Sequence, residues 1–219
     1  MIWDFDGTIA DTFAAIRVAS ERALAVHGLP PADEATLRSS VGLSLPRIFA
    51  RLVGTEGGDR LIDALTATYR REFVTAGPQH TSLFPGIEAL LAELGDAAVT
   101  SVVATSKGRA GVVMMLDRLE IAGHFAGVIS DDDVQNKKPH PEMVLTACAR
   151  DGRLPKDAVV VGDTEFDIEM GRAAGASTIG VTWGNKARAD LAGARPTHLV
   201  DDVEELASLL RRDVRARTP

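Results

Sequence analysis

Apolar runs and helical spacing alternate along most of the second half of the chain. The runs are short and rich in valine and isoleucine, and each ends in polar or small residues, as buried strands do. We expect strands within residues 100–106, 125–130, 157–163, 177–182 and 197–200. We expect helices, from the spacing of apolar residues, over 109–119, 141–150, 165–174 and 203–212. This alternation predicts a doubly wound, Rossmann-like α/β fold, with a parallel sheet covered by helices on both faces.

Residues 12–82 break the alternation, because they have helical periods and no convincing strand. One helix is expected over 11–26 with Asp11 as its cap. Another is expected over 44–54, begun by a serine and a proline and ended by a glycine. A third follows over 61–76, where large apolar residues repeat every four positions. The simplest interpretation is an all-helical cap domain inserted into the core fold.

The insert divides the chain into two domains. We expect residues 1–12 and 83–219 to form a discontinuous α/β core, and residues 13–82 to form the helical cap. The cap is bracketed by Asp11 and Thr12 on one side and by the loop that reaches Phe84, Pro85 and Gly86 on the other. No internal repeat or low-complexity tract interrupts this organisation.

Composition narrows the class of protein. Of 219 residues, 45% are hydrophobic and 25% are charged, which is ordinary for a globular chain. The formal net charge of −7 argues against nucleic acid or an anionic membrane as a partner. The single cysteine, Cys148, allows no internal disulfide and fits a reducing compartment. Since neither a signal peptide nor an apolar run of roughly 20 residues is present, we expect a cytoplasmic protein.

The first candidate for chemistry is the run from Asp4 to Thr8, with sequence DFDGT. Residues two apart on a strand share a face, so the carboxylates of Asp4 and Asp6 can point toward one site as the strand ends. Gly7 permits a tight turn and the close approach of a ligand. The alternative is an acidic turn that only caps the next helix.

Two later strand ends carry groups that can bind an anion. The hydroxyl of Thr105 and the amides beside it can hold anion oxygens, although such a threonine is often only a turn residue. Lys138 precedes Pro139, which restricts it to extended conformations, so its ammonium can be held against a phosphate. Lys137 is the alternative, and lysine pairs are commonly solvated.

The last candidates follow another buried run. Asp163 stands at the strand end, where it could also cap a helix, and Asp167 follows one helical turn later on the same side. With Asp4 and Asp6, four carboxylates would meet at one sheet edge with only Lys138 to offset them. Carboxylates this close do not all stay ionised cheaply. Since Mg2+ prefers oxygen ligands together with a substrate phosphate, the sequence predicts a magnesium site.

Together these segments resemble the haloacid dehalogenase superfamily of phosphatases, in the branch with a helical cap after the first strand. DFDGT, VVATS, NKKP and VGDTEFD occur in this order over nearly the whole chain. ATSK, NKKPHP, VGDTEFDIEMGRAAG and GVTWGN look most like phosphoglycolate phosphatases. The resemblance makes the first strand central. Because only three residues precede Asp4, either this strand is unusually short or the natural start of the chain lies upstream. We expect two or three apolar residues added in front of Met1 to raise stability.

The resemblance implies hydrolysis of a phosphate monoester through a phospho-aspartyl intermediate. Asp4 would be the nucleophile, and Asp6 would be the general acid and then the general base. Mg2+ would be held by Asp4, Asp163 and the backbone carbonyl of Asp6. Asp167 would orient these ligands from behind.

The resemblance also implies how the substrate is held. Thr105, the Ser106 amide and Lys138 would bind the phosphoryl oxygens. The loop before Arg47 would face the core, so Arg47 or Arg17 is a candidate to meet the distal group of the substrate, for example a carboxylate. The alternative is that both arginines are ordinary surface residues.

Other activities can be weighed against residues of this chain. Asp6 argues against a dehalogenase, because a dehalogenase has no leaving alkoxide to protonate. Residues 12–82 contain no lysine, which argues against a phosphonoacetaldehyde hydrolase, because that enzyme needs a lysine in its cap. The expected substrate is a small phosphorylated metabolite, first 2-phosphoglycolate, then sugar phosphates and pyrophosphate. A mutase like β-phosphoglucomutase would keep the same core. A phospho-accepting receiver domain is the alternative of another class, but it has neither a cap nor an acid/base residue two positions after the acceptor. Monomer and homodimer both remain open.

Overall fold

A six-stranded parallel sheet forms the centre of the core, as the alternation predicts. The computed structural model describes residues 1–54 and 60–217. Its main-sheet strands are β1 (Ile2–Trp3), β4 (Val102–Thr105), β5 (Gly127–Ser130), β6 (Val159–Gly162), β7 (Ser177–Val181) and β8 (His198–Val200). Their order is β5-β4-β1-β6-β7-β8, and all neighbours run parallel. The strand before Asp4 is therefore central, and it is only two residues long.

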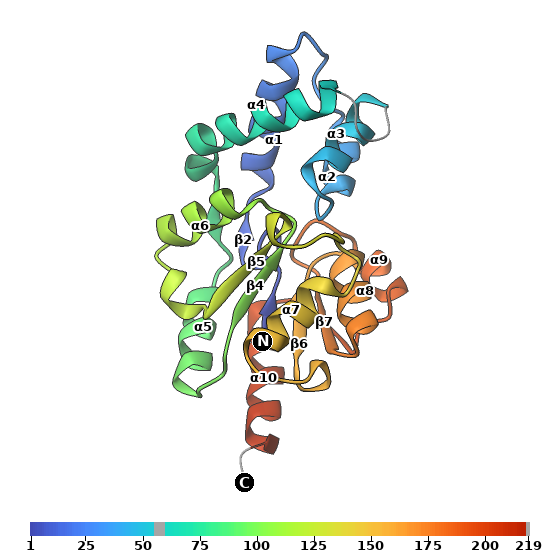
Figure 1. The fold of residues 1–219 in the computed structure, drawn as a ribbon. Coiled ribbons are helices and arrows are strands. Elements are labelled where there is room, and N and C mark those ends of the chain that lie inside the picture. The colour runs from blue at the N-terminus through green and yellow to red at the C-terminus, as the bar shows by residue number, and fades with distance from the viewer. Residues whose placement is uncertain (55–59, 218–219) are drawn as a thin grey trace.

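Helices cover both faces of this sheet (Figure 1). They are α5 (Ile87–Asp96), α6 (Arg109–Arg118), α7 (Glu142–Arg150), α8 (Glu165–Ala174), α9 (Arg188–Gly193) and α10 (Val203–Arg217). Trp3 and Val161 lie in the same apolar cluster as buried residues of α5, α6 and α10. Ile2 and Val160 lie in a second cluster, with residues of α7 and α8. Since neighbouring strand residues point to opposite faces, burial of both faces explains the continuous apolar runs.

The remaining helices stand together beyond the carboxyl ends of the strands (Figure 1). They are α1 (Phe13–Val26), α2 (Glu34–Ser40), α3 (Leu45–Val53) and α4 (Arg60–Ala76). The chain enters and leaves this helical part through an antiparallel ribbon, in which β2 (Ala10–Asp11) pairs with β3 (Ser82–Leu83). We therefore keep residues 13–82 as a proposed cap domain; residues 55–59 of the cap and 218–219 of the core lie outside the described residues.

Short turns complete the chain. The 3-10 helices of the described residues are Gly77–His80, Ala122–His124, Asp131–Asp133 and Pro155–Asp157. None of the described helices combines the length and the apolar character needed to cross a bilayer.

Three local features differ from the sequence prediction. The N-cap of α1 is Thr12, while the Asp11 carboxylate accepts a long bond of 3.4 Å from the backbone N–H of Phe13. α2 was not predicted, because only Leu37 and Ser40 of its seven residues are buried and no helical period develops. The ribbon was also missed, since strands of two residues carry no periodicity.

Candidate active site

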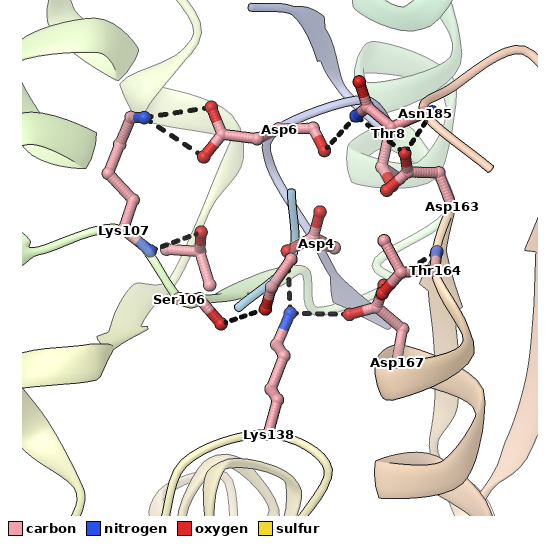
Figure 2. Close-up of polar contacts among 12 residues, drawn as sticks. Asp4, Asp6, Thr8, Ser106, Lys107, Lys138, Asp163, Thr164, Asp167 and Asn185 are labelled. Carbon is pink, nitrogen blue, oxygen red and sulfur yellow. Dashed lines mark hydrogen bonds and ion pairs between the residues drawn. The ribbon is translucent and has the colours of Figure 1, made fainter. Parts of the chain in front are cut away.

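Three buried carboxylates meet at the carboxyl edge of the sheet (Figure 2). Asp4 directly follows β1, Asp163 directly follows β6, and Asp167 lies in the first turn of α8. One oxygen from each lies within 4.8 Å of the others. The structure thus brings together groups more than 150 positions apart, because the carboxyl ends of parallel strands share one edge.

The side-chain ammonium group of one lysine contacts two of these carboxylates. Lys138 Nζ donates to Asp4 Oδ1 at 2.7 Å and to Asp167 Oδ1 at 2.6 Å, and its side chain is almost completely buried. Burial by itself lowers the pKa of Lys138, but the charges of Asp167 and Asp4 outweigh it and hold that pKa above its ordinary value. Lys137 instead donates to two backbone carbonyls of the loop before it. Of the two lysines, Lys138 is therefore the one in the site.

Negative charge exceeds positive charge in this cluster. Burial raises the pKa of Asp4 well above its ordinary value, and the charges of Asp167 and Asp163 raise it further against the opposing effect of Lys138. Burial, followed by the charge of Asp167, raises the pKa of Asp163 to about 7. One lysine is thus insufficient for three buried carboxylates. An all-oxygen, electron-rich donor set of this kind fits Mg2+.

Asp163 is held by a residue that the sequence reasoning missed. The backbone N–H and side-chain amide of Asn185 donate to Asp163 Oδ2 at 2.6 and 2.9 Å. Thr8 Oγ1 donates to Asp163 Oδ1 at 3.4 Å, and the Asn185 amide also reaches the backbone carbonyl of Asp6 at 3.5 Å. Asn185 stands four residues after β7, so its place behind a strand end at the same edge was a usable signal.

Asp167 and Gly7 complete the support of the cluster. Asp167 Oδ2 accepts from the backbone N–H and the hydroxyl of Thr164, at 3.1 and 2.6 Å, in a capping box that fixes the start of α8. Gly7 has a φ of +89°, and a Cβ there would lie 2.2 Å from Asp163 Oδ2 and from the Asn185 side-chain amide. A glycine is therefore required for both the turn and the packing.

Asp6 lies outside the cluster of Asp4, Asp163 and Asp167, and its carboxylate pairs with a different lysine. Lys107 Nζ, from the loop after β4, is 2.9 and 3.1 Å from the two Asp6 carboxylate oxygens (Figure 2). The expectation that only Lys138 offsets the four carboxylates is therefore wrong. Sequence alone did not reveal Lys107, because pairing across 101 positions depends on how the strand ends are arranged.

Comparison with known proteins places the chain in a family. A family model described as "Haloacid dehalogenase-like hydrolase" matches residues 1–181. The chain belongs to this family. It is 35% identical to the "Probable phosphatase IndB" of Dickeya dadantii (strain 3937) over 208 residues, which cover 94% of this chain and 90% of that protein. It is 29% identical to the "Phosphoglycolate phosphatase" of Salmonella choleraesuis (strain SC-B67), with coverages of 95% and 90%.

A solved structure agrees with this placement. The putative haloacid dehalogenase-like hydrolase from Bacteroides fragilis superposes with a TM-score of 0.88 at 25% identity, covering 94% of this chain and 97% of that one. The protein is thus a phosphatase of the haloacid dehalogenase-like hydrolase family, and the predicted family and enzyme class are confirmed.

In this phosphatase the cap lies directly on the core beside the site. Ser106 Oγ donates to the Gly42 carbonyl at 2.7 Å, and Lys186 Nζ donates to the Ser39 carbonyl at 2.7 Å. Thr105 is buried, and its hydroxyl accepts from the backbone N–H of Lys107 at 3.1 Å. The end of α2 and the turn after it, residues 39–42, therefore face the strand ends, in the region where the resemblance placed the loop before Arg47.

Helix α4 brings aromatic side chains of the cap to the same region. Tyr69 and Phe73 stack with ring centroids 5.8 Å apart, and the Phe73 ring lies 4.2 Å from Lys107 Nζ. Burial, followed by the charge of Asp6, raises the pKa of Tyr69 well above its ordinary value. These contacts place the two aromatic side chains of the cap next to Lys107 and Asp6.

The two arginines proposed for specificity have no such contact. Arg17 pairs with Glu21 of its own helix at 2.8 Å, and both side chains are well exposed. Arg47 is exposed on α3, and within residues 1–54 and 60–217 it has no hydrogen-bond or ion-pair partner. Their roles stay predictions.

Proposed function

We propose that this phosphatase hydrolyses a small phosphate monoester through a phospho-aspartyl intermediate at Asp4, with Mg2+ as cofactor and 2-phosphoglycolate as the first-choice substrate. One observation carries the proposal. Asp4, Asp163 and Asp167 form a buried cluster whose one ion-pair partner among the described residues is Lys138, at the strand ends where a ligand of an α/β sheet binds.

Asp4 is the proposed nucleophile. Lys138 holds only its Oδ1 atom, which fixes the carboxylate and leaves Oδ2 to attack phosphorus. Attack forms the Asp4–phosphorus bond as the bond from phosphorus to the substrate oxygen breaks. Water then cleaves the acyl phosphate, releases inorganic phosphate and restores the carboxylate.

Asp6 is the proposed acid and base. It lies two residues after the nucleophile on the side of the site that faces the cap, beside Lys107 and Tyr69. In the first step it gives a proton to the leaving oxygen, and in the second it takes a proton from the attacking water. Lys107 holds both of its oxygens, so the carboxyl group has one fixed direction.

Asp4, Asp163 and the backbone carbonyl of Asp6 would hold Mg2+, and Asp167 would orient them. Asn185 joins two of these groups, since it donates to Asp163 and reaches the Asp6 carbonyl. When bound, the ion would neutralise the excess negative charge of the cluster and stabilise charge on the transferred phosphoryl group. Thr105, the Ser106 amide and Lys138 are the proposed contacts to the phosphoryl oxygens.

The substrate is proposed from the relatives and from the contacts that hold the cap against the core beside the site. A relative matched over 90% of its own length is named a phosphoglycolate phosphatase, and the cap contact at Gly42 favours a small ester. Sugar phosphates, pyrophosphate and a mutase reaction are the alternatives. Monomer or homodimer, and a cytoplasmic location, stay predictions.

Initial rates of phosphate release from a panel of phosphorylated metabolites test the proposal. We expect turnover that requires Mg2+ and is fastest with 2-phosphoglycolate, and loss of turnover in Asp4→Asn. Asp96→Asn, an exposed carboxylate on α5, is the matched control. Transfer of one phosphoryl group to each protein molecule, with one equivalent of alcohol released and no inorganic phosphate, would favour the receiver-like alternative instead. Isomerisation of a sugar phosphate without release would favour the mutase.

A further inference from the structure

Lys107 is the cation that contacts the acid/base carboxylate. Its Nζ lies 2.9 and 3.1 Å from the Asp6 oxygens, and the Lys107 and Asp6 side chains are only 9% and 14% exposed. The pair is therefore largely desolvated, and an anion that enters beside it meets a positive charge that water screens weakly.

The cap fixes where this ammonium points. Phe73 of α4 lies 4.2 Å from Lys107 Nζ, and a cation prefers the face of an aromatic ring at this separation. Phe73 in turn stacks on Tyr69, and the neighbouring Ser106 is tied to the cap carbonyl of Gly42. Lys107 thus belongs to the core, but its position depends on the seated cap.

Other cations near the site have different partners. Lys138 donates hydrogen bonds to the Asp4 and Asp167 carboxylates. At the rim, Arg70 pairs with Asp132, and Lys186 pairs with Glu165. Among the residues that the structure describes, Lys107 is thus the cation in contact with Asp6, on the side from which the alcohol departs.

Distances then limit what Lys107 can reach. Acid catalysis brings the leaving oxygen within about 3.2 Å of an Asp6 oxygen, so Lys107 Nζ lies at most about 6 Å from the leaving oxygen. A carboxylate on the ester-bearing carbon has its oxygens within about 4 Å of the leaving oxygen, since three bonds of about 1.2 to 1.5 Å separate them. Rotation about the bonds of the ester can therefore bring such an anion into contact with the ammonium group of Lys107.

We propose that Lys107, positioned by Phe73, is the specificity-determining residue of this phosphatase. It binds a carboxylate carried by the same carbon as the phosphate ester and so selects phosphorylated 2-hydroxycarboxylates, of which 2-phosphoglycolate is the smallest. This role rests on the proposed function and replaces Arg47 and Arg17 as the group that recognises the distal anion. A charge-assisted contact with the ammonium ion supplies the discrimination.

Two esters of nearly equal size test the assignment. One is 2-phosphoglycolate, and the other is 2-hydroxyethyl phosphate, in which a neutral CH2OH group replaces the carboxylate. The measured quantity is the ratio of their kcat/KM values on one preparation with Mg2+, which is independent of the fraction of folded enzyme. The variants are Lys107→Met, Lys107→Arg and Arg47→Ala. Lys156→Met, at an exposed lysine near the amino end of β6, is the control.

We expect the preference for 2-phosphoglycolate to fall about 10- to 100-fold in Lys107→Met, the loss for one hydrogen bond to a charged group. Lys107→Arg should recover part of the preference, and Lys156→Met should keep it. The assignment would be overturned if Lys107→Met kept the ratio of the wild type, or if the ratio fell in Arg47→Ala alone. The proposed function would still stand in either case, provided that the wild type turns over 2-phosphoglycolate. Failure of the wild type to hydrolyse either ester would overturn the proposed function itself.

Discussion

Replacement of Asp163 by asparagine should stabilise the metal-free protein at the expense of activity. The Asp163 side chain is fully buried, and burial together with the charge of Asp167 raises its pKa from 3.8 to about 7. Asparagine has the same shape and no charge. Its carbonyl can accept both bonds from Asn185, and its NH2 group would face the hydroxyl of Thr8, which can accept.

The sign and the size of the effect follow from proton linkage. Between pH 4 and pH 7 the native protein retains a proton at Asp163 that the unfolded chain has released, so stability falls as the pH rises through this range. A rise of about three pKa units corresponds to about 4 kcal/mol. Metal-free Asp163→Asn should therefore be more stable than wild type by up to about 4 kcal/mol at pH 8, and the difference should shrink toward zero near pH 4.

Urea unfolding in EDTA, from pH 4 to pH 8, measures this difference. Asp96→Asn is the control, because it removes an exposed carboxylate and should change stability by less than about 0.5 kcal/mol. Added Mg2+ should stabilise the wild type by mass action and leave Asp163→Asn almost unaffected. The difference in unfolding free energy between the two proteins should therefore become smaller or change sign. The reasoning is refuted if Asp163→Asn gains no stability at pH 8, or if its gain does not depend on pH.

Three further substitutions probe the support of the site. Lys138→Met leaves two buried carboxylates without their partner, so thermal unfolding should report a loss of about 3–5 kcal/mol, and activity should vanish. Gly7→Ala should cost more stability than Gly28→Ala by about 1–3 kcal/mol, since both glycines have positive φ but only the Gly7 Cβ would clash; equal melting temperatures would contradict this. Asn185→Ala removes two bonds to a proposed metal ligand, so the apparent Mg2+ affinity in a rate titration should fall about 10- to 100-fold, and an unaltered titration would count against its role.

The parallel sheet and the edge that carries the chemistry could be read from the sequence. Apolar runs with no alternation require burial on both faces, and only a parallel sheet between helix layers provides this. Since the carboxyl ends of such strands share one edge, Asp4 and Asp163 were expected at that edge. The pairing of β1 with β6 in the structure makes them neighbours there. The placement of Asp167 followed from a single helical turn.

Other features depended on the tertiary structure. Side-chain directions and loop paths carry no periodic signal in the sequence. They decide that Lys138 rather than Lys137 enters the site, that Lys107 pairs with Asp6, and that Asn185 donates to Asp163. The placement of Phe73 over Lys107 depends on how the cap sits on the core. The local pattern of this chain thus determined which groups reach the sheet edge, whereas long-range packing decided which of them touch, because a contact between distant segments is fixed only when both are placed.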